Sequence, residues 1–218
     1  MKISELRERV RVAREDAGSS EALRQWLDRK LPQLHRTISM RDDAGTTLFN
    51  FIQAYIERVP DILEAAQSVA NHAKMRPQLI PVLKVAEEFF LRPSATPGSD
   101  RGLLVLLDEA YLAHRMVEEV NDRYVSHGGE SLIPMSNTKA NVIVYELLGE
   151  EYANQLDAAV DEAVAGLLPE DVFESPAFLA YKAGIDEDVR QDMWRRWPNM
   201  AEELGVGLTW REDTPDCP

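Results

Sequence analysis

The chain has 218 residues, of which 44% are hydrophobic and 28% are charged. A chain of this length and composition buries a substantial core without disulfides or metals, which excludes an overall disordered protein and a membrane-embedded one. The formal net charge of −14 argues against sequence-independent binding to nucleic acid, because that affinity comes from Lys and Arg side chains that neutralise phosphates.

The charge is distributed unevenly along the chain. Residues 1–41 contain ten Lys or Arg against six Asp or Glu, a net +4, which leaves a net −18 for the remaining residues. Two hypotheses follow from this asymmetry. The basic N-terminal segment either docks on the acidic body of the same chain or forms a contact surface for an anionic partner.

The spacing of apolar residues predicts helices along nearly the whole chain, because these residues recur every three or four positions. The predicted helices are 3–15, 21–31, 33–40, 46–58, 61–75, 78–91, 102–126, 137–148, 150–166, 176–183 and 187–204. Segment 141–145 has β-branched character, but a lone strand has no partner, so it is assigned to a helix. The predicted fold class is therefore all-α, a multi-helix bundle around the long helix 102–126.

The composition changes near Pro169, since three of the four Trp residues, Trp194, Trp197 and Trp210, lie in the last 25 residues. We therefore expect residues 1–168 to form the helical bundle domain. Residues 169–218 are expected to form a C-terminal helical appendage packed on the same domain.

The segment TISMRDDAGTTLFNFIQAYIERVPDILEAA, residues 37–66, resembles the turn and recognition helix of TetR-type regulators. The resemblance implies a DNA-binding transcriptional regulator. The sequence departs from the family pattern between Arg41 and Gly45, where there is no room for the first helix of the motif. The segment LFNFIQAYIERV also has few cations to hold a duplex, so this function ranks third.

The segment 103–127 contains the main candidate for a metal site. On a helical wheel, His114 lies about 80° from the predicted core face, with Glu118 one turn further on the same side. A His and a Glu four residues apart can share a metal, and Glu146 is the candidate ligand from a second helix, with Glu87, Glu88 and Glu150 as further carboxylates. The alternative hypothesis is structural: His114 lies at the border of the core and pairs with its neighbour.

Common catalytic patterns are absent from the sequence. No His is preceded by Glu at the Glu-x-x-His spacing of ferritin-like di-iron bundles, and HExxH does not occur. The nucleophile motif GxSxG and the phosphate-binding motifs GxGxxG and GxxxxGK[ST] are also absent. These observations favour a protein without a common catalytic or nucleotide-binding site.

His127 is a second candidate, because it lies near two Gly residues and near Ser126, Glu130, Ser131 and Ser136 in a predicted loop. Loops on a rigid scaffold often carry binding sites. The alternative is that His127 belongs to a helix C-terminus, which Gly128 or Gly129 caps and where a cation favours the helix dipole.

We therefore expect an acidic, non-enzymatic helical protein that binds a protein partner or a second copy of itself. The alternative is a helical-bundle enzyme that depends on a divalent metal held by His114, Glu118 and Glu146. No cofactor, nucleic acid or membrane is expected. The N-terminus is charged, and the only cysteine, Cys217, leaves no partner for an intrachain disulfide. We therefore expect a cytoplasmic location.

Overall fold

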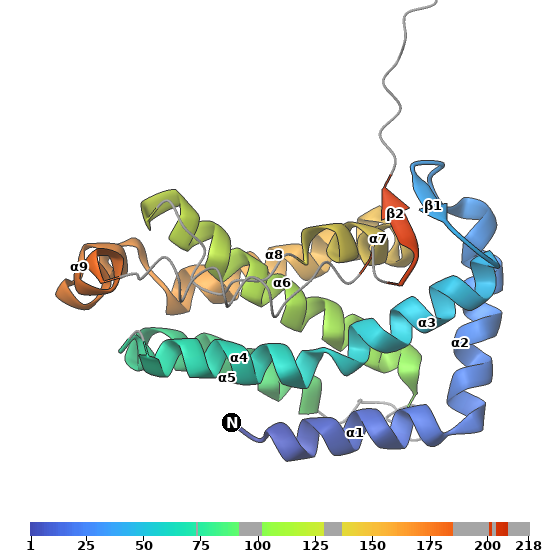
Figure 1. Ribbon diagram of the computed structural model, residues 1–218, viewed down its shortest axis with the longest axis horizontal. Helices are drawn as coiled ribbons and strands as arrows, with labels where there is room; N and C mark the ends of the chain where they lie inside the picture. Colours follow the sequence, from blue (N-terminus) through green and yellow to red (C-terminus); the bar gives the residue numbers. More distant parts are fainter. Residues whose placement is uncertain (73, 92–101, 129–136, 185–200, 202–203, 209–218) are drawn as a thin grey trace, which may run out of the picture.

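The computed structural model describes residues 1–72, 74–91, 102–128, 137–184, 201 and 204–208 (Figure 1). Most of these residues lie in helices, so the predicted all-α class is confirmed. The α-helices are α1 (Ile3–Glu15), α2 (Ala17–Lys30), α3 (Ala44–Glu57), α4 (Val59–His72), α5 (Arg76–Leu91), α6 (Leu103–Gly128), α7 (Thr138–Leu148), α8 (Glu150–Leu167) and α9 (Pro176–Ala183). Short elements are the 3₁₀ helices η1 (Leu31–Gln33) and η2 (Glu170–Glu174) and the strands β1 (Ile38–Met40) and β2 (Val206–Leu208).

Helix α6 packs against α5, α8, α3 and several other helices. In Figure 1, α4 and α5 lie on one side of α6, and α7 and α8 lie on the other. The apolar face that the sequence predicts for α6 is buried, with each residue no more than 1% exposed. These residues are Leu106, Ala110, Ala113, Val117, Val120 and Tyr124.

Local sequence signals explain where several helices begin. The Asp16 carboxylate accepts the Gly18 N–H at 3.0 Å and caps α2, and the Asp43 carboxylate accepts the Thr46 N–H at 2.8 Å and caps α3. Pro60 and Pro77 lie in the first turns of α4 and α5, where a missing N–H leaves no helical hydrogen bond unmade. Segment 141–145 is helical, as predicted, and lies within α7.

The predicted helix 33–40 is wrong. The chain forms η1 and then strand β1, which pairs antiparallel with β2 in the register Ile38↔Leu208, Ser39↔Gly207 and Met40↔Val206. The strand partner lies about 170 residues away in the sequence, so no local pattern reveals it. Pro32 lies in η1 directly after α2 and ends that helix, because a Pro within a continuing helix would lose a backbone hydrogen bond.

Two helices begin against polar side chains that come from distant helices. The Glu87 carboxylate of α5 accepts the backbone N–H of Lys2, the N-cap residue of α1, at 2.8 Å. The Ser19 hydroxyl of α2 accepts the backbone N–H of Leu103 at 2.6 Å, at the start of α6. Each side chain satisfies a backbone N–H that has no partner within its own helix.

The segment after α8 packs on the end of α6 through aromatic rings. The Tyr124 ring meets Phe173 and Phe178 edge to face, with both pairs of ring centroids 5.3 Å apart. The division into residues 1–168 and 169–218 stays a prediction, and most of the predicted helix 187–204 lies outside the described residues. Within the part that the structure describes, no helix has the length and apolar character needed to cross a membrane.

Candidate functional site

His114 lies in the core of the bundle, between α6 and α3. Its side chain is 1% exposed, and its ring stacks on the Tyr55 ring with centroids 3.9 Å apart and planes inclined by 22°. The expectation that His114 lies at the border of the core is therefore wrong. A helical wheel gives only the angle of a residue around its own helix. It could not reveal that α3 and the start of α7 cover this side of α6 and bury His114.

Both ring nitrogens of His114 have protein partners. Nε2 lies 2.9 Å from the backbone carbonyl oxygen of Tyr55, and Nδ1 lies 3.1 Å from the Asn137 side-chain nitrogen. Burial lowers the pKa of His114 to about 4, so the ring is neutral near pH 7. The two partners then fix the tautomer, because the Nε2–H donates to the carbonyl and Nδ1 accepts from the amide.

Glu118 does not pair with His114. Its carboxylate accepts hydrogen bonds from Arg115, from the Thr138 hydroxyl at 2.6 Å and from the Asn141 amide at 2.6 Å. Asn141 in turn accepts the Tyr55 hydroxyl at 2.7 Å. Tyr55 therefore joins the two groups: its backbone contacts His114, and its hydroxyl reaches Glu118 through Asn141.

Arg115 connects these hydrogen-bonded residues to α8. We call the whole group the polar cluster; it consists of Tyr55, Tyr111, His114, Arg115, Glu118, Asn137, Thr138, Asn141 and Asp157. Its Nε donates to the Asp157 carboxylate at 2.9 Å, and the Tyr111 hydroxyl donates to the same carboxylate oxygen at 3.0 Å. Burial, followed by the negative charge of Asp157, raises the pKa of Tyr111 well above its ordinary value. The cluster consequently ties α3, α6, α7 and α8 together through charge-assisted hydrogen bonds.

The structure does not bring the remaining carboxylate candidates to His114. Glu146 is exposed on α7, Glu88 and Glu150 are exposed as well, and Glu87 binds the Lys2 N–H. Within the described ranges, no group of three His, Cys, Asp or Glu side chains is arranged to hold a metal ion. A metal on His114 and Glu118 would have to displace hydrogen bonds that both residues already make.

His127 lies in the last turn of α6 rather than in a loop. Its Nδ1 lies 2.9 Å from the Arg123 carbonyl oxygen, and its ring stacks on Phe173 with centroids 4.2 Å apart and planes inclined by 6°. The backbone carbonyl of His127 accepts Lys182 Nζ at 3.4 Å. His127 thus contacts the C-terminal segment, while Glu130, Ser131 and Ser136 lie outside the described residues.

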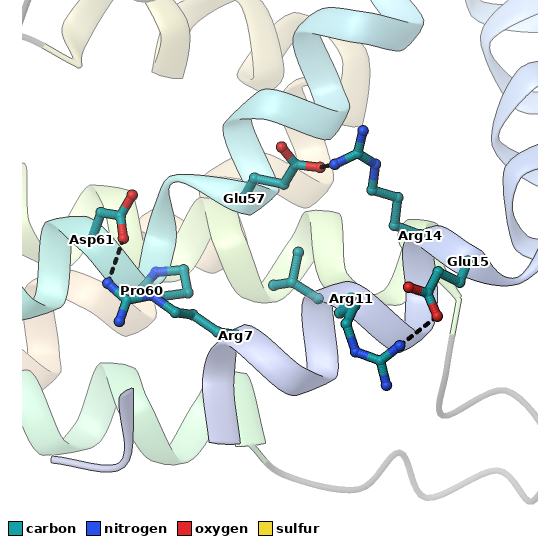
Figure 2. Close-up of a pocket in the computed structure, with 8 residues that line it drawn as sticks. Arg7, Arg11, Arg14, Glu15, Glu57, Pro60 and Asp61 are labelled. Carbon is teal, nitrogen blue, oxygen red and sulfur yellow. Dashed lines mark hydrogen bonds and ion pairs between the residues drawn. The ribbon is translucent and has the colours of Figure 1, made fainter. Parts of the chain in front are cut away.

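A groove of about 490 Å³ lies between α1 and the junction of α3 and α4 (Figure 2). The Arg side chains that line it point toward carboxylates of the same chain, as Figure 2 shows. Arg7 lies 2.8 Å from both Asp61 and Glu64, and Arg14 lies 2.8 Å from Glu57. Arg11, the third arginine, pairs with two carboxylates of its own helix, Glu8 and Glu15. The positive charges of the arginines in the groove are therefore neutralised by carboxylates of the same chain.

A more buried ion pair also holds α1 to α6. Arg9 Nη2 lies 3.1 Å from both oxygens of Glu109, and the two side chains are 17% and 14% exposed. Burial raises the pKa of Glu109 to about 7, although the charge of Arg9 acts in the opposite direction. The docking of the basic N-terminal helix on the acidic body is thus the arrangement found for α1.

The second half of the basic segment is arranged differently. Four cations follow one another in the stretch 29–41, which contains no Asp or Glu; they are Arg29, Lys30, Arg36 and Arg41. We call these four residues the cationic corner, because the end of α2 and strand β1 meet at one corner of the molecule (Figure 1). Within the described chain, none of the four makes an ion pair with a carboxylate, and the three Arg side chains are exposed.

Lys30 is the half-buried member of the cationic corner. Its Nζ lies 5.5 Å from the centre of the Trp26 ring, and a Cβ added at Gly149 would lie 3.9 Å from Nζ. This approach places the turn between α7 and α8 beside the corner. The cationic corner is consequently anchored to the bundle rather than isolated on a loop.

No protein-family model, curated protein or solved structure matches this chain. The segment that resembles TetR-type regulators forms β1, α3 and the start of α4. Helix α3, which would be the recognition helix, buries Leu48, Phe51, Ile52 and Ile56 completely and packs on α2 and α6. The exposed residues of α3 are Thr46 and Asn50, and the helix contains no Lys or Arg to contact phosphates. The DNA-binding hypothesis stays a prediction.

Sequence reasoning missed most members of the polar cluster. Tyr55, Asn137 and Asn141 lie in apolar or helix-start contexts, where their types are common without a shared role. The one local signal was the pair Arg115 and Glu118, which lie three residues apart on a helix and so face each other. Asp157 could not be linked to Arg115 without the packing of α8 on α6.

Proposed function

We propose that this chain is a non-enzymatic helical module that binds another protein, with the cationic corner as its contact surface. The observation that carries the proposal is the contrast between the two halves of the basic segment. The cations of residues 1–16 are neutralised by carboxylates of the same chain, whereas Arg29, Arg36 and Arg41 are exposed and form no such pair with the residues that the structure describes.

Physical chemistry supports a partner at this position. The chain has 38 Asp and Glu residues against 24 Lys and Arg, so carboxylates are abundant on its surface. Unpaired cations that are grouped in such a protein create a local positive potential, which steers an oppositely charged surface into one orientation. Arg is also enriched at protein interfaces relative to the rest of protein surfaces.

The polar cluster around His114 supports the same proposal in a different way. Its hydrogen bonds link four helices, and its donors and acceptors are engaged with one another. Such a cluster specifies how these helices pack, and Lys30 of the cationic corner lies against Gly149 in the turn between two of them, α7 and α8. A rigid surface binds with a smaller entropic cost, because fewer side chains and segments become ordered in the complex.

The proposal is tested by capturing proteins from an extract of the source cells with three immobilised forms of the chain. The first is the wild type, and the second is the double variant Arg29→Glu and Arg36→Glu. The third is a matched control, Arg76→Glu and Lys84→Glu, which makes the same change of charge on the exposed face of α5. A protein that is retained by the wild type and the control, but not by the Arg29→Glu and Arg36→Glu double variant (the corner variant), supports the proposal. Equal retention by all three forms contradicts it.

The mass of the purified chain in solution distinguishes a second copy from a different partner. If the partner is a copy of the same chain, the wild type and the α5 control sediment as dimers and the corner variant as a monomer. If the partner is a different protein, all three forms sediment as monomers. If the double variant Arg29→Glu and Arg36→Glu is still a dimer, self-association takes place elsewhere on the surface.

A further inference from the structure

The residue types and spacing of the cationic corner indicate the chemistry of its partner. This inference rests on the proposed function and adds the class of ligand to it. We propose that the cationic corner binds an acidic polypeptide segment of another protein, whose Asp and Glu side chains pair with Arg29, Arg36 and Arg41.

The stretch 29–41 contains no carboxylate of its own, which favours the binding of negative charge there. The stretch 29–41 has four cations and no Asp or Glu, and the nearest acids in sequence are Asp28, Asp42 and Asp43. Asp43 is occupied in capping α3 through the Thr46 N–H. Three of the four cations are Arg, whose planar guanidinium group matches a carboxylate with two parallel hydrogen bonds.

The backbone holds these cations at a fixed separation. Arg36 and Arg41 flank strand β1, whose register is set by the pairs Ile38↔Leu208 and Met40↔Val206. The Arg41 N–H also donates to the Gly205 carbonyl oxygen at 3.1 Å, so the end of the strand is held in place. Arg36 lies in the turn that the Ile38 N–H closes on the His35 carbonyl oxygen at 2.9 Å, and the three residues of β1 rise roughly 10 Å before Arg41. A single small anion cannot bridge that distance, whereas a peptide of several residues can.

Nucleic acid and membranes fit the corner less well than an acidic peptide. A duplex carries a dense row of phosphates, which the net charge of −14 repels at every point beyond the corner. A membrane surface favours basic clusters that also carry apolar side chains for insertion. The exposed large apolar residues of the described chain, Val125, Val142, Tyr152 and Leu179, lie outside the stretch 29–41.

The test measures binding of the full chain to a fluorescein-labelled poly-glutamate peptide by fluorescence anisotropy at increasing salt. We expect binding by the wild type that weakens with salt, because exposed charges are screened. The Arg29→Glu and Arg36→Glu double variant should bind roughly tenfold more weakly, since two exposed ion pairs are lost and replaced by repulsion. The Arg76→Glu and Lys84→Glu control should bind as the wild type does, apart from a small effect of net charge.

The folding of each variant is checked by circular dichroism and melting temperature, and Arg29→Gln with Arg36→Gln gives a second variant without new negative charge. Three outcomes overturn the inference: no binding of poly-glutamate at low salt, equal weakening in the corner and α5 variants, or tighter corner-dependent binding of duplex DNA or phosphatidylserine vesicles. If poly-glutamate fails but cellular capture still depends on the corner, the proposed function stands and only the ligand class is wrong. If poly-glutamate binds but no protein is captured, the inferred class of ligand is supported and the proposed function is contradicted.

Discussion

The imidazole ring of His114 stacks on the phenol ring of Tyr55 and also bonds to the backbone of the same residue. The ring centroids are 3.9 Å apart, and Nε2 lies 2.9 Å from the Tyr55 carbonyl oxygen. A backbone carbonyl of α3 that bonds to a side chain of α6 fixes both the depth and the rotation of α3. This contact gives the most specific predictions about stability.

Replacing His114 by Ala should lower the free energy of unfolding by about 2–4 kcal/mol, because it removes the stacked ring and leaves buried groups on Tyr55 and Asn137 without their bonds. Urea unfolding measures the change. The matched control is His35→Ala, since His35 is exposed, and that loss should stay within about 0.5 kcal/mol. Equal small losses for both variants would show that His114 does not contribute to the packing in this way.

The stability of the fold should fall as the pH is lowered through the range in which His114 titrates. The pKa of His114 is about 4 in the folded chain and ordinarily 6.5, so the unfolded chain takes up a proton first. This difference removes about 3 kcal/mol of stability between pH 6.5 and pH 4. The measurement is urea unfolding across this range for the wild type and for His114→Gln, which does not titrate.

Glu109 acts in the opposite direction in an overlapping pH range. Its pKa is raised to about 7 by burial, so the folded chain takes up a proton before the unfolded chain does, and stability rises as the pH falls. Because Glu109 is present in both proteins, its effect cancels when the wild type is compared with His114→Gln. Parallel pH profiles for the two proteins would contradict the predicted role of His114.

Adding Zn²⁺ or Mn²⁺, or removing metals with EDTA, should leave the melting temperature unchanged. The nitrogens of His114 and the oxygens of Glu118 already bond to protein groups, so a metal must displace those bonds before it can bind. A metal site would raise stability by about 2.7 kcal/mol at a hundredfold excess over Kd. A metal-dependent rise that both His114→Ala and Glu118→Ala abolish would establish the alternative, a metal-dependent protein.

The Glu87→Ala variant should loosen the start of α1, because the Glu87 carboxylate is the cap that accepts the Lys2 N–H. We expect a loss of about 1 kcal/mol, the usual effect of losing an N-terminal cap. Hydrogen exchange should speed up in the first turn of α1 and stay unchanged in α8. The exposed neighbour Glu88 provides the control, and similar exchange in Glu87→Ala and Glu88→Ala would contradict the capping role.

The all-α class and most helices could be predicted because they depend on local patterns. The core face of α6 follows from spacing alone, and Pro60 and Pro77 mark helix starts by the chemistry of their own rings. Strand β1 could not be predicted, because its hydrogen bonds go to β2 at the far end of the chain. The same reason hid the burial of His114, which depends on how α3 covers α6.

The charge asymmetry of the N-terminus was visible in the sequence, but its division into two halves was not. The pairing of Arg7 with Asp61 and of Arg9 with Glu109 depends on the positions of α4 and α6. Only the structure shows that Arg29 and Arg36 form no such pair with any carboxylate in the described part of the chain. A count of charges therefore predicts that a surface is basic, and the fold decides which cations are available to a partner.

A photo-crosslinking measurement in the source cells tests the central claim most directly. A photoreactive amino acid such as p-benzoylphenylalanine replaces exposed Gln33, which lies in the stretch 29–41 but is not one of its four cations, or, in the control, exposed Arg76 on α5. We expect a light-dependent, higher-mass adduct containing a second protein for the Gln33 position and none for the Arg76 position. Absence of an adduct at position 33, or equal adducts at both positions, would contradict a partner-binding role for the cationic corner.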